Sequence, residues 1–183
     1  YADMGTEEHF CAGCEIHCVQ GWGPGAQAMV NQIVQTGDVD RARFILHVGD
    51  ISYARSTSIV WESFFDTIMP IAPKIPYQVE IGNHEYDHLT GGGNGKDPSG
   101  TTDPSGYHPS WGNQGDDSDG ECGVPTFHRF GAPRTLGSNS VFWYSFNYAN
   151  VHVVVITGEL SLEAGSPQYN FLQADLASVD RSV

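Results

Sequence analysis

The sequence predicts an α/β fold in which short parallel strands alternate with helices, and two patterns indicate it. Apolar runs at 44–48 and 77–81 each lead into a glycine followed by a polar residue, as buried parallel strands do. Apolar residues recur at helical spacing over about 28–34 and 59–69, and Gly37 and Pro70 end these two helices. Alternation of strands and helices implies a parallel sheet with right-handed crossovers.

The helix at 59–69 should bury a broad apolar face. We expect that face to consist of Ile59, Val60, Phe64, Phe65, Ile68 and Met69.

The C-terminal part of the chain predicts a hairpin and a further helix. Aromatic and polar residues alternate over 142–148, an apolar run fills 151–156, and a two-residue turn joins them. Ser166 and Pro167 then suit the first positions of a helix. The inner side of that helix is expected to carry Phe171, Leu172, Leu176 and Val179.

Length and composition limit the function classes. A chain of 183 residues with 39% hydrophobic residues can bury a core and suits one domain, or a large part of one. Eight basic against 22 acidic residues give a net charge of −14, which argues against nucleic acid or an anionic membrane as a partner. No apolar run approaches the ~20 residues of a spanning helix. The sequence does not indicate an oligomeric state.

Residues 86–135 are rich in glycine and proline and predict a long loop. Because strands resume after it, we interpret it as a surface excursion near the mouth of a site and treat 1–183 as one domain. It contains an acidic group made of Asp116, Asp117, Asp119 and Glu121. Calcium binding is one interpretation, but the spacing departs from the EF-hand pattern, which favours a solvated acidic turn.

The chain has four cysteines, and their pairing is open. Three of them are clustered and one is remote: Cys11, Cys14, Cys18 and Cys122. One or two disulfides in an oxidising compartment is the favoured interpretation. A zinc site that adds His9 or His17, and free thiols, are the alternatives.

Three short segments carry candidate chemistry: Asp3-Met4-Gly5, Gly49-Asp50-Ile51-Ser52-Tyr53 and Gly82-Asn83-His84-Glu85. The last two directly follow predicted strands, and the first precedes the first helix. Functional residues of open α/β sheets gather at the carboxyl ends of the strands. We therefore expect the three segments to meet at one rim of the sheet.

The side chains of these segments are hard oxygen donors. Two carboxylates (Asp3, Asp50), a phenol (Tyr53) and an amide (Asn83) suit Fe(III), Mn(II) or Zn(II). Two metals about 3.5–4 Å apart are an established arrangement for phosphoester hydrolysis. His84, next to Asn83, could protonate the leaving group. Each segment alone is more often a turn or a core residue, and it is their ordered set that is specific.

The ordered set resembles the purple acid phosphatases of the metallophosphoesterase superfamily, which show D-x-G, G-D-x-x-Y and G-N-H-[D/E] in this order. Later segments are similar too, and the likeness is strongest to plant or algal members. They are Cys122-Gly123-Val124-Pro125, Trp143-Tyr144-Ser145-Phe146, Val151-His152 and Gly165-Ser166-Pro167-Gln168-Tyr169.

The resemblance implies an αββα sandwich, of which this chain covers roughly the first half, and an acid phosphatase that hydrolyses small phosphate monoesters. It implies that Asp3 and Tyr53 bind Fe(III), that Asp50 bridges two metals, and that Asn83 binds a divalent Zn, Mn or Fe. His84 would contact the substrate phosphate or the leaving group. It further implies a secreted, extracellular or vacuolar protein, which agrees with disulfides.

Two family motifs, V-x-x-H and G-H-x-H, are absent from the chain. We expect His47 and His152, which lie within apolar strands, to be packed or hydrogen-bonded residues. A partial segment of a complete phosphatase is therefore expected, in preference to a naturally shortened protein. The alternatives are a non-catalytic surface or interaction protein with a degenerate phosphatase fold, and a related phosphodiesterase.

Overall fold

A computed structural model describes residues 1–6, 26–89, 97–101 and 115–182 of the chain. The elements within these ranges are α1 (Ala26–Gln35), α2 (Asp38–Arg41), β1 (Ile45–Val48), α3 (Ser58–Ile68), β2 (Tyr77–Glu80), α4 (Asn83–Tyr86), α5 (Val124–Arg129), β3 (Trp143–Tyr148), β4 (Val151–Ile156) and α6 (Pro167–Ser178). The four predicted strands and the three longer predicted helices are confirmed.

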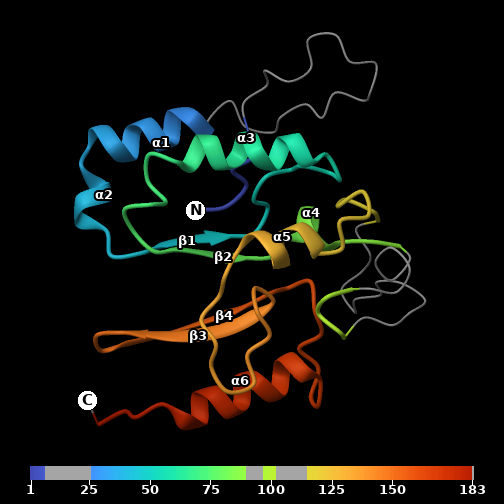
Figure 1. The fold of residues 1–183 in the computed structure, drawn as a ribbon. Helices are drawn as coiled ribbons and strands as arrows, with labels where there is room; N and C mark the ends of the chain where they lie inside the picture. Colours follow the sequence, from blue (N-terminus) through green and yellow to red (C-terminus); the bar gives the residue numbers. More distant parts are fainter. Residues whose placement is uncertain (7–25, 90–96, 102–114, 183) are drawn as a thin grey trace.

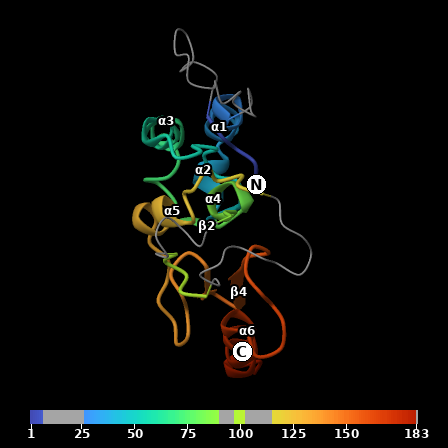
Figure 2. The same ribbon diagram turned by 90° about the vertical axis from the view of Figure 1, so that its right-hand side faces the viewer.

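The elements stack in four layers (Figure 1). Helices α1 and α3 lie over the parallel pair β1–β2, the antiparallel hairpin β3–β4 lies on the other side of that pair, and α6 lies beyond the hairpin. The view turned by 90° keeps the same order of layers (Figure 2). The described part of the chain thus has the αββα order that the family resemblance implies.

The buried stripe of α3 differs from the predicted face. Trp61, Phe64 and Ile68 are almost fully buried, at the spacing of three and four residues that places side chains on one side of a helix. Ile59 and Met69 are 52% and 59% exposed, so their predicted burial was wrong. The prediction omitted Trp61, whose indole fixes which side of the helix faces the sheet.

The first residues of the chain extend the parallel pair. Tyr1 donates its amine to the Leu46 carbonyl (3.0 Å) and accepts from the Val48 amide (2.7 Å), as a parallel neighbour of β1 would. The ladder continues beyond β1, where Met4 donates its backbone N–H to the Asp50 carbonyl (3.1 Å). Asp3 is thereby placed beside the carboxyl end of β1.

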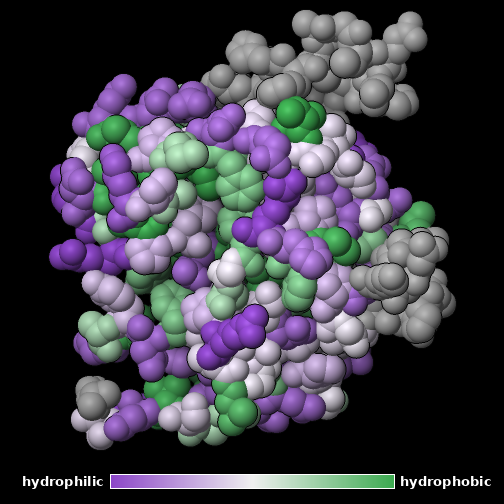
Figure 3. All heavy atoms as spheres, viewed as in Figure 1, coloured by the Kyte–Doolittle hydropathy of each residue, from purple (hydrophilic) through white to green (hydrophobic). Residues whose placement is uncertain are grey.

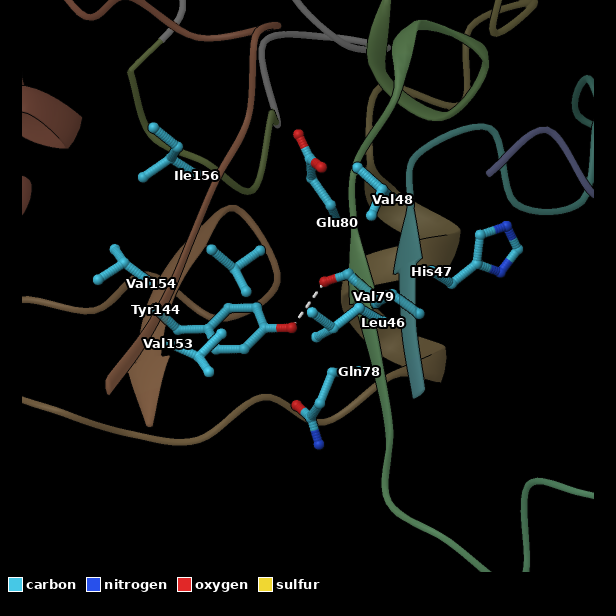
Figure 4. A pocket seen from close by; sticks show the side chains of 11 residues that line it. Leu46, His47, Val48, Gln78, Val79, Glu80, Tyr144, Val153, Val154 and Ile156 are labelled. Carbon is cyan, nitrogen blue, oxygen red and sulfur yellow. Dashed lines mark hydrogen bonds between the residues drawn. The ribbon is translucent and has the colours of Figure 1, made fainter. Parts of the chain in front are cut away.

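The two sheets face each other across an apolar pocket (Figure 4). Tyr144 of β3 crosses the gap and donates its hydroxyl to the Val79 carbonyl of β2 (2.8 Å). The pocket has a volume of about 210 Å³ and includes the carboxyl group of Glu80 among its mainly aliphatic walls. Burial, and secondarily the charge of Glu159, raise the pKa of Glu80 to about 7.

The face of the molecule drawn in Figure 3 shows no such concentration of apolar residues among the described residues. On the face seen in Figure 3, hydrophobic side chains are scattered among hydrophilic ones, and hydrophilic residues cover much of α1 and α2. Within the described ranges, no helix has the length and apolar character needed to cross a membrane.

The stretch at 86–135 is only partly a surface loop. It contains α5, which begins after Gly123, a residue with a φ of 74°. Six polar or charged residues on the described parts of the stretch are buried: Asp87, His88, Ser99, Ser118, Glu121 and Thr126. The prediction of an irregular excursion was therefore wrong for Val124–Arg129, which form α5, whereas 115–123 and 130–135 contain no helix or strand.

Helix α6 begins as predicted, with the Ser166 hydroxyl accepting from the Tyr169 amide (3.3 Å). Its inner side is different from the prediction: Phe171 is buried as expected, but Leu176 is 41% exposed. A buried carboxylate, Asp175, occupies the inner position instead. The apolar pattern missed it because Asp175 packs by hydrogen bonding and not by hydrophobic contact.

Asp175 joins α6 to the hairpin. Its carboxylate accepts from the Ser145 hydroxyl of β3 (2.5 Å) and lies 2.6 Å from Nε2 of His152 on β4. The other ring nitrogen of His152 lies 2.6 Å from Oδ1 of Asn147. The prediction that His152 is a hydrogen-bonded structural residue is confirmed.

His47 on β1 is a packed residue, also as predicted. It is fully buried, and Nδ1 lies 2.9 Å from the Tyr77 hydroxyl, which accepts in turn from the Tyr1 hydroxyl (2.7 Å). Burial is the main cause that lowers the pKa of His47 to about 3, so the ring is neutral at physiological pH.

Replacement of Asp175 tests the contact between α6 and the hairpin. Asp175→Ala leaves the Ser145 hydroxyl and the His152 ring without their acceptor, and we expect a loss of about 2 kcal/mol or more in the free energy of unfolding. Asp66→Ala, at an exposed position of α3, is the matched control and should change it by less than about 0.5 kcal/mol. Urea unfolding measures both; equal effects of the two variants would contradict the assignment.

Candidate metal centre

The loops that follow β1 and β2 touch each other through two glycines. A Cβ on Gly49 would lie 3.1 Å from Cα of Gly82, and a Cβ on Gly82 would lie 2.5 Å from the backbone nitrogen of Asp50. Gly49 also has a φ of +70°, which L side chains rarely adopt. Glycine at both positions therefore lets the two strand ends meet.

Three oxygen-bearing side chains gather next to this contact. The Tyr53 hydroxyl donates to Oδ1 of Asp3 (3.0 Å) and to Oδ2 of Asp50 (3.1 Å). All three residues are in the left-handed region, with φ values of 53° for Asp3, 50° for Asp50 and 54° for Tyr53. Such backbone costs of the order of 1–3 kcal/mol per residue and is concentrated at functional sites.

Asn83 and His84 complete the group from the start of α4. The backbone N–H of His84 donates to the other oxygen of Asp50, Oδ1 (3.3 Å), and its ring lies 4.4 Å from that of Tyr53, measured between centroids. Asn83 donates its amide Nδ2 to Oδ2 of Asp117 (2.9 Å). The structure therefore brings together four of the residues that the sequence singled out, and Asn83 adjoins them as the neighbour of His84 in α4.

Glu85 lies beneath the site and binds both loops. Its Oε1 accepts from the Ile51 amide (2.7 Å) and its Oε2 accepts from the Gly82 amide (3.2 Å). The side chain is 1% exposed, and burial, followed by the nearby charge of Asp50, raises its pKa to about 8. Glu85 belongs to the third motif of the sequence, but the motif alone does not predict this role.

The charge state of the oxygen cluster follows from its burial. Burial is the largest cause that raises the pKa of Asp50, and the charge of Asp3 adds to it. Burial and the Asp50 and Asp3 carboxylates raise the pKa of Tyr53 far above its ordinary value. Without a cation the phenol is therefore protonated and serves as the donor that separates two carboxylates.

The donor set fits a hard cation. Oxygen ligands of one octahedral ion, at about 2.0–2.1 Å from it, lie about 3 Å apart. The Tyr53 oxygen lies at such distances from both carboxylates. Among the residues that the structure describes, no group of three His, Cys, Asp or Glu side chains could hold a metal. The candidate set instead joins two carboxylates to a phenol and an amide.

The acidic group at 116–121 is not simply a solvated turn. Glu121 is 4% exposed, and its Oε1 accepts from the Trp61 indole and from the Ser56 amide, both at 3.0 Å. Burial raises its pKa to about 7. Asp119 forms an exposed ion pair with Arg55 (2.7 Å). The prediction of a solvated turn was therefore wrong for Glu121. The sequence gives no local sign of its burial, because its partner Trp61 is 60 residues away in the chain.

The predicted disulfides stay a prediction. Cys11, Cys14 and Cys18, together with His9 and His17 of the zinc alternative, lie outside the described residues. Cys122 is buried, and its thiol donates to the Gly120 carbonyl (3.3 Å).

Comparison with known proteins gives one consistent family. The chain is 39% identical over 165 residues to a protein of Arabidopsis thaliana named "Probable inactive purple acid phosphatase 9", a match that covers 84% of this chain and 23% of that protein. Its structure matches that of a purple acid phosphatase from yellow lupin (Lupinus luteus) seeds, with a TM-score of 0.72 and 32% identity, over 99% of this chain and 27% of that one. This chain belongs to the purple acid phosphatase family.

Three further findings bear on the family match. A third relative is named for another reaction: it is a "Nucleotide pyrophosphatase/phosphodiesterase" of Hordeum vulgare, 31% identical over 163 residues, which cover 86% of this chain and 37% of that protein. The chain thus spans well under half the length of these purple acid phosphatase relatives and their homologue. No protein-family model matches it. The αββα order of layers nevertheless agrees with the metallophosphoesterase fold of the lupin enzyme.

Gly82→Ala tests the contact on which the centre is built. The φ of Gly82, −100°, is accessible to alanine, so only the clash of the new Cβ with Asp50 acts against the substitution. We expect a loss of about 1–3 kcal/mol in the free energy of unfolding. Gly131→Ala, where a Cβ meets nothing within 4 Å, is the control and should be neutral. Urea unfolding compares the two, and a neutral Gly82→Ala would contradict the close approach.

Proposed function

We propose that the protein that carries this chain is a metal-dependent acid phosphatase, which hydrolyses small phosphate monoesters at a dinuclear centre. The observation that carries the proposal is the convergence of Asp3, Asp50 and Tyr53 at the carboxyl end of β1. The Tyr53 oxygen lies 3.0 Å from Oδ1 of Asp3 and 3.1 Å from Oδ2 of Asp50. Family membership supports the reaction class.

The proposed roles follow from the positions of the side chains. Asp3 and Tyr53 would hold Fe(III), and Asn83 a divalent Zn, Mn or Fe. Asp50 would bridge the two, because one of its oxygens faces Tyr53 and the other faces the start of α4. The two ions, when bound, supply charge neutralisation for phosphate and a water of lowered pKa. Further ligands would come from outside these 183 residues.

His84 is proposed as the residue that contacts the substrate phosphate or the leaving group. Its Nδ1 lies 3.2 Å from the backbone carbonyl of Asp117. A carbonyl only accepts, so Nδ1 carries a hydrogen and Nε2 is the atom left for the substrate. The His84 ring packs against that of Tyr53, with 4.4 Å between centroids, so the imidazole lies beside the oxygen cluster.

Two other functions have specific support. The relative named "Probable inactive purple acid phosphatase 9" favours a non-catalytic protein that keeps the fold. The relative named for pyrophosphatase and phosphodiesterase activity favours diester or pyrophosphate substrates. A secreted, extracellular or vacuolar location remains our proposal from the family resemblance and the four cysteines.

Metal analysis and hydrolysis assays of the full-length protein test the proposal. We expect about two metal ions per molecule, one of them iron, and hydrolysis of p-nitrophenyl phosphate. Asp50→Ala should lower kcat by at least about 100-fold, since it removes the bridge between the ions, whereas Asp66→Ala should leave kcat unchanged.

The outcomes separate the candidate functions. Metal with hydrolysis of bis-p-nitrophenyl phosphate alone would favour a phosphodiesterase. Metal without turnover on either substrate would favour the non-catalytic protein. A wild-type protein that binds no metal would contradict the dinuclear centre itself.

A further inference from the structure

We propose that Asp117 is a positioning residue of the centre, which orients the Asn83 amide toward the divalent ion and fixes the tautomer of His84. The inference rests on the proposed function, since it assumes a cation at Asn83. Asp117 belongs to none of the motifs that carry the family resemblance.

The segment that carries Asp117 is anchored to both loops of the site. On one side, Asp119 pairs with Arg55, and Glu121 accepts from the Ser56 amide, just beyond Tyr53. On the other side, the hydroxyl of Ser118 donates to the carbonyl of Asp87 (2.7 Å), just beyond α4. Gly123 donates its amide to the Glu85 carbonyl (2.7 Å). These bonds hold the segment between the two loops, so the position of Asp117 is determined by the fold.

The contact with Asn83 decides which end of the amide is available to a cation. A carboxylate at neutral pH only accepts hydrogen bonds, so the end of Asn83 that faces Asp117 is Nδ2, at 2.9 Å from Oδ2. Oδ1 is then directed away from Asp117, and only that oxygen can bind a cation. Loss of the acceptor would let the amide rotate and present nitrogen to the centre.

The contact with His84 involves the backbone of the same residue. The Asp117 carbonyl accepts from Nδ1 (3.2 Å), which places the hydrogen of the neutral ring on Nδ1. One residue therefore orients both a proposed ligand and the proposed substrate contact, through its side chain and its carbonyl respectively. Partners of this kind usually change metal affinity or activity about 10–100-fold when they are removed.

The test uses the full-length protein, freed of its divalent ion, loaded with iron and titrated with Zn²⁺. Asp117→Ala removes the acceptor of Asn83 but keeps the carbonyl that binds His84, so we expect Zn²⁺ affinity to fall about 10–100-fold. Asp117→Asn keeps an accepting oxygen and should stay within about threefold of wild type. Asp116→Ala, at the exposed neighbouring aspartate, is the matched control and should bind Zn²⁺ as the wild type does.

A spectroscopic readout distinguishes positioning from general damage. The visible absorption band of Tyr53 bound to Fe(III) should persist in all three variants, because Asp117 bonds to Asn83 and His84, whereas Tyr53 bonds to Asp3 and Asp50. Excess Zn²⁺ should restore occupancy in Asp117→Ala. Wild-type Zn²⁺ affinity in that variant, an equal loss in Asp117→Asn, or loss of the band together with Zn²⁺ would overturn the inference.

Failure of the inference can be told from failure of the proposed function. If the wild type binds both ions but hydrolyses no phosphomonoester, the proposed activity fails while the Zn²⁺ titration still judges Asp117. If the wild type binds no ion, both are overturned.

Discussion

The loops after β1 and β2 are in backbone contact, and this contact brings Asp50 next to His84. It exists because neither Gly49 nor Gly82 has a side chain to separate them. The Asp50 carboxylate consequently lies between the Tyr53 hydroxyl and the backbone N–H of His84 in α4. Glu85 then closes the arrangement from below by accepting one backbone N–H from each loop. Burial of a carboxyl group costs desolvation free energy, and here the hydrogen bonds that both oxygens of Glu85 accept offset this cost.

The strained backbone of the site is balanced by ordinary hydrogen bonds around it. Asp3, Asp50 and Tyr53 each have a positive φ, which projects their side chains toward one point. The strand-like backbone hydrogen bonds from Met4 to Asp50 and from Gly5 to Ile51 hold Asp3 and Asp50 in place. Residues far from the site, such as Ser140 and Ala149, also have a positive φ, so it is the convergence of the three side-chain oxygens that suits a cation.

The sequence predicts the strands and the long helices well, because strand-end motifs and apolar periodicity are local signals. It fails where hydrogen bonds replace apolar contacts. Asp175 is an example, since it occupies the buried side of α6 in place of Leu176. The roles of Glu85 and Asp117 are also not predictable from the sequence. Glu85 bonds to Ile51, which is distant in sequence, and Asp117 is one of several neighbouring acidic residues, of which it alone bonds to Asn83. Such partners are visible only once the fold brings the loops together.

The central claim is that Asp3, Asp50 and Tyr53 are ligands of one metal ion, and anomalous diffraction from crystals of the full-length protein at the iron edge tests it most directly. We predict an anomalous peak about 2.0–2.2 Å from the Tyr53 oxygen and from one oxygen of each aspartate, with the hydroxyl no longer donating to either. A map from iron-supplemented crystals with no peak at this position, in which the Tyr53 hydroxyl still bonds to both carboxylates, would contradict the claim.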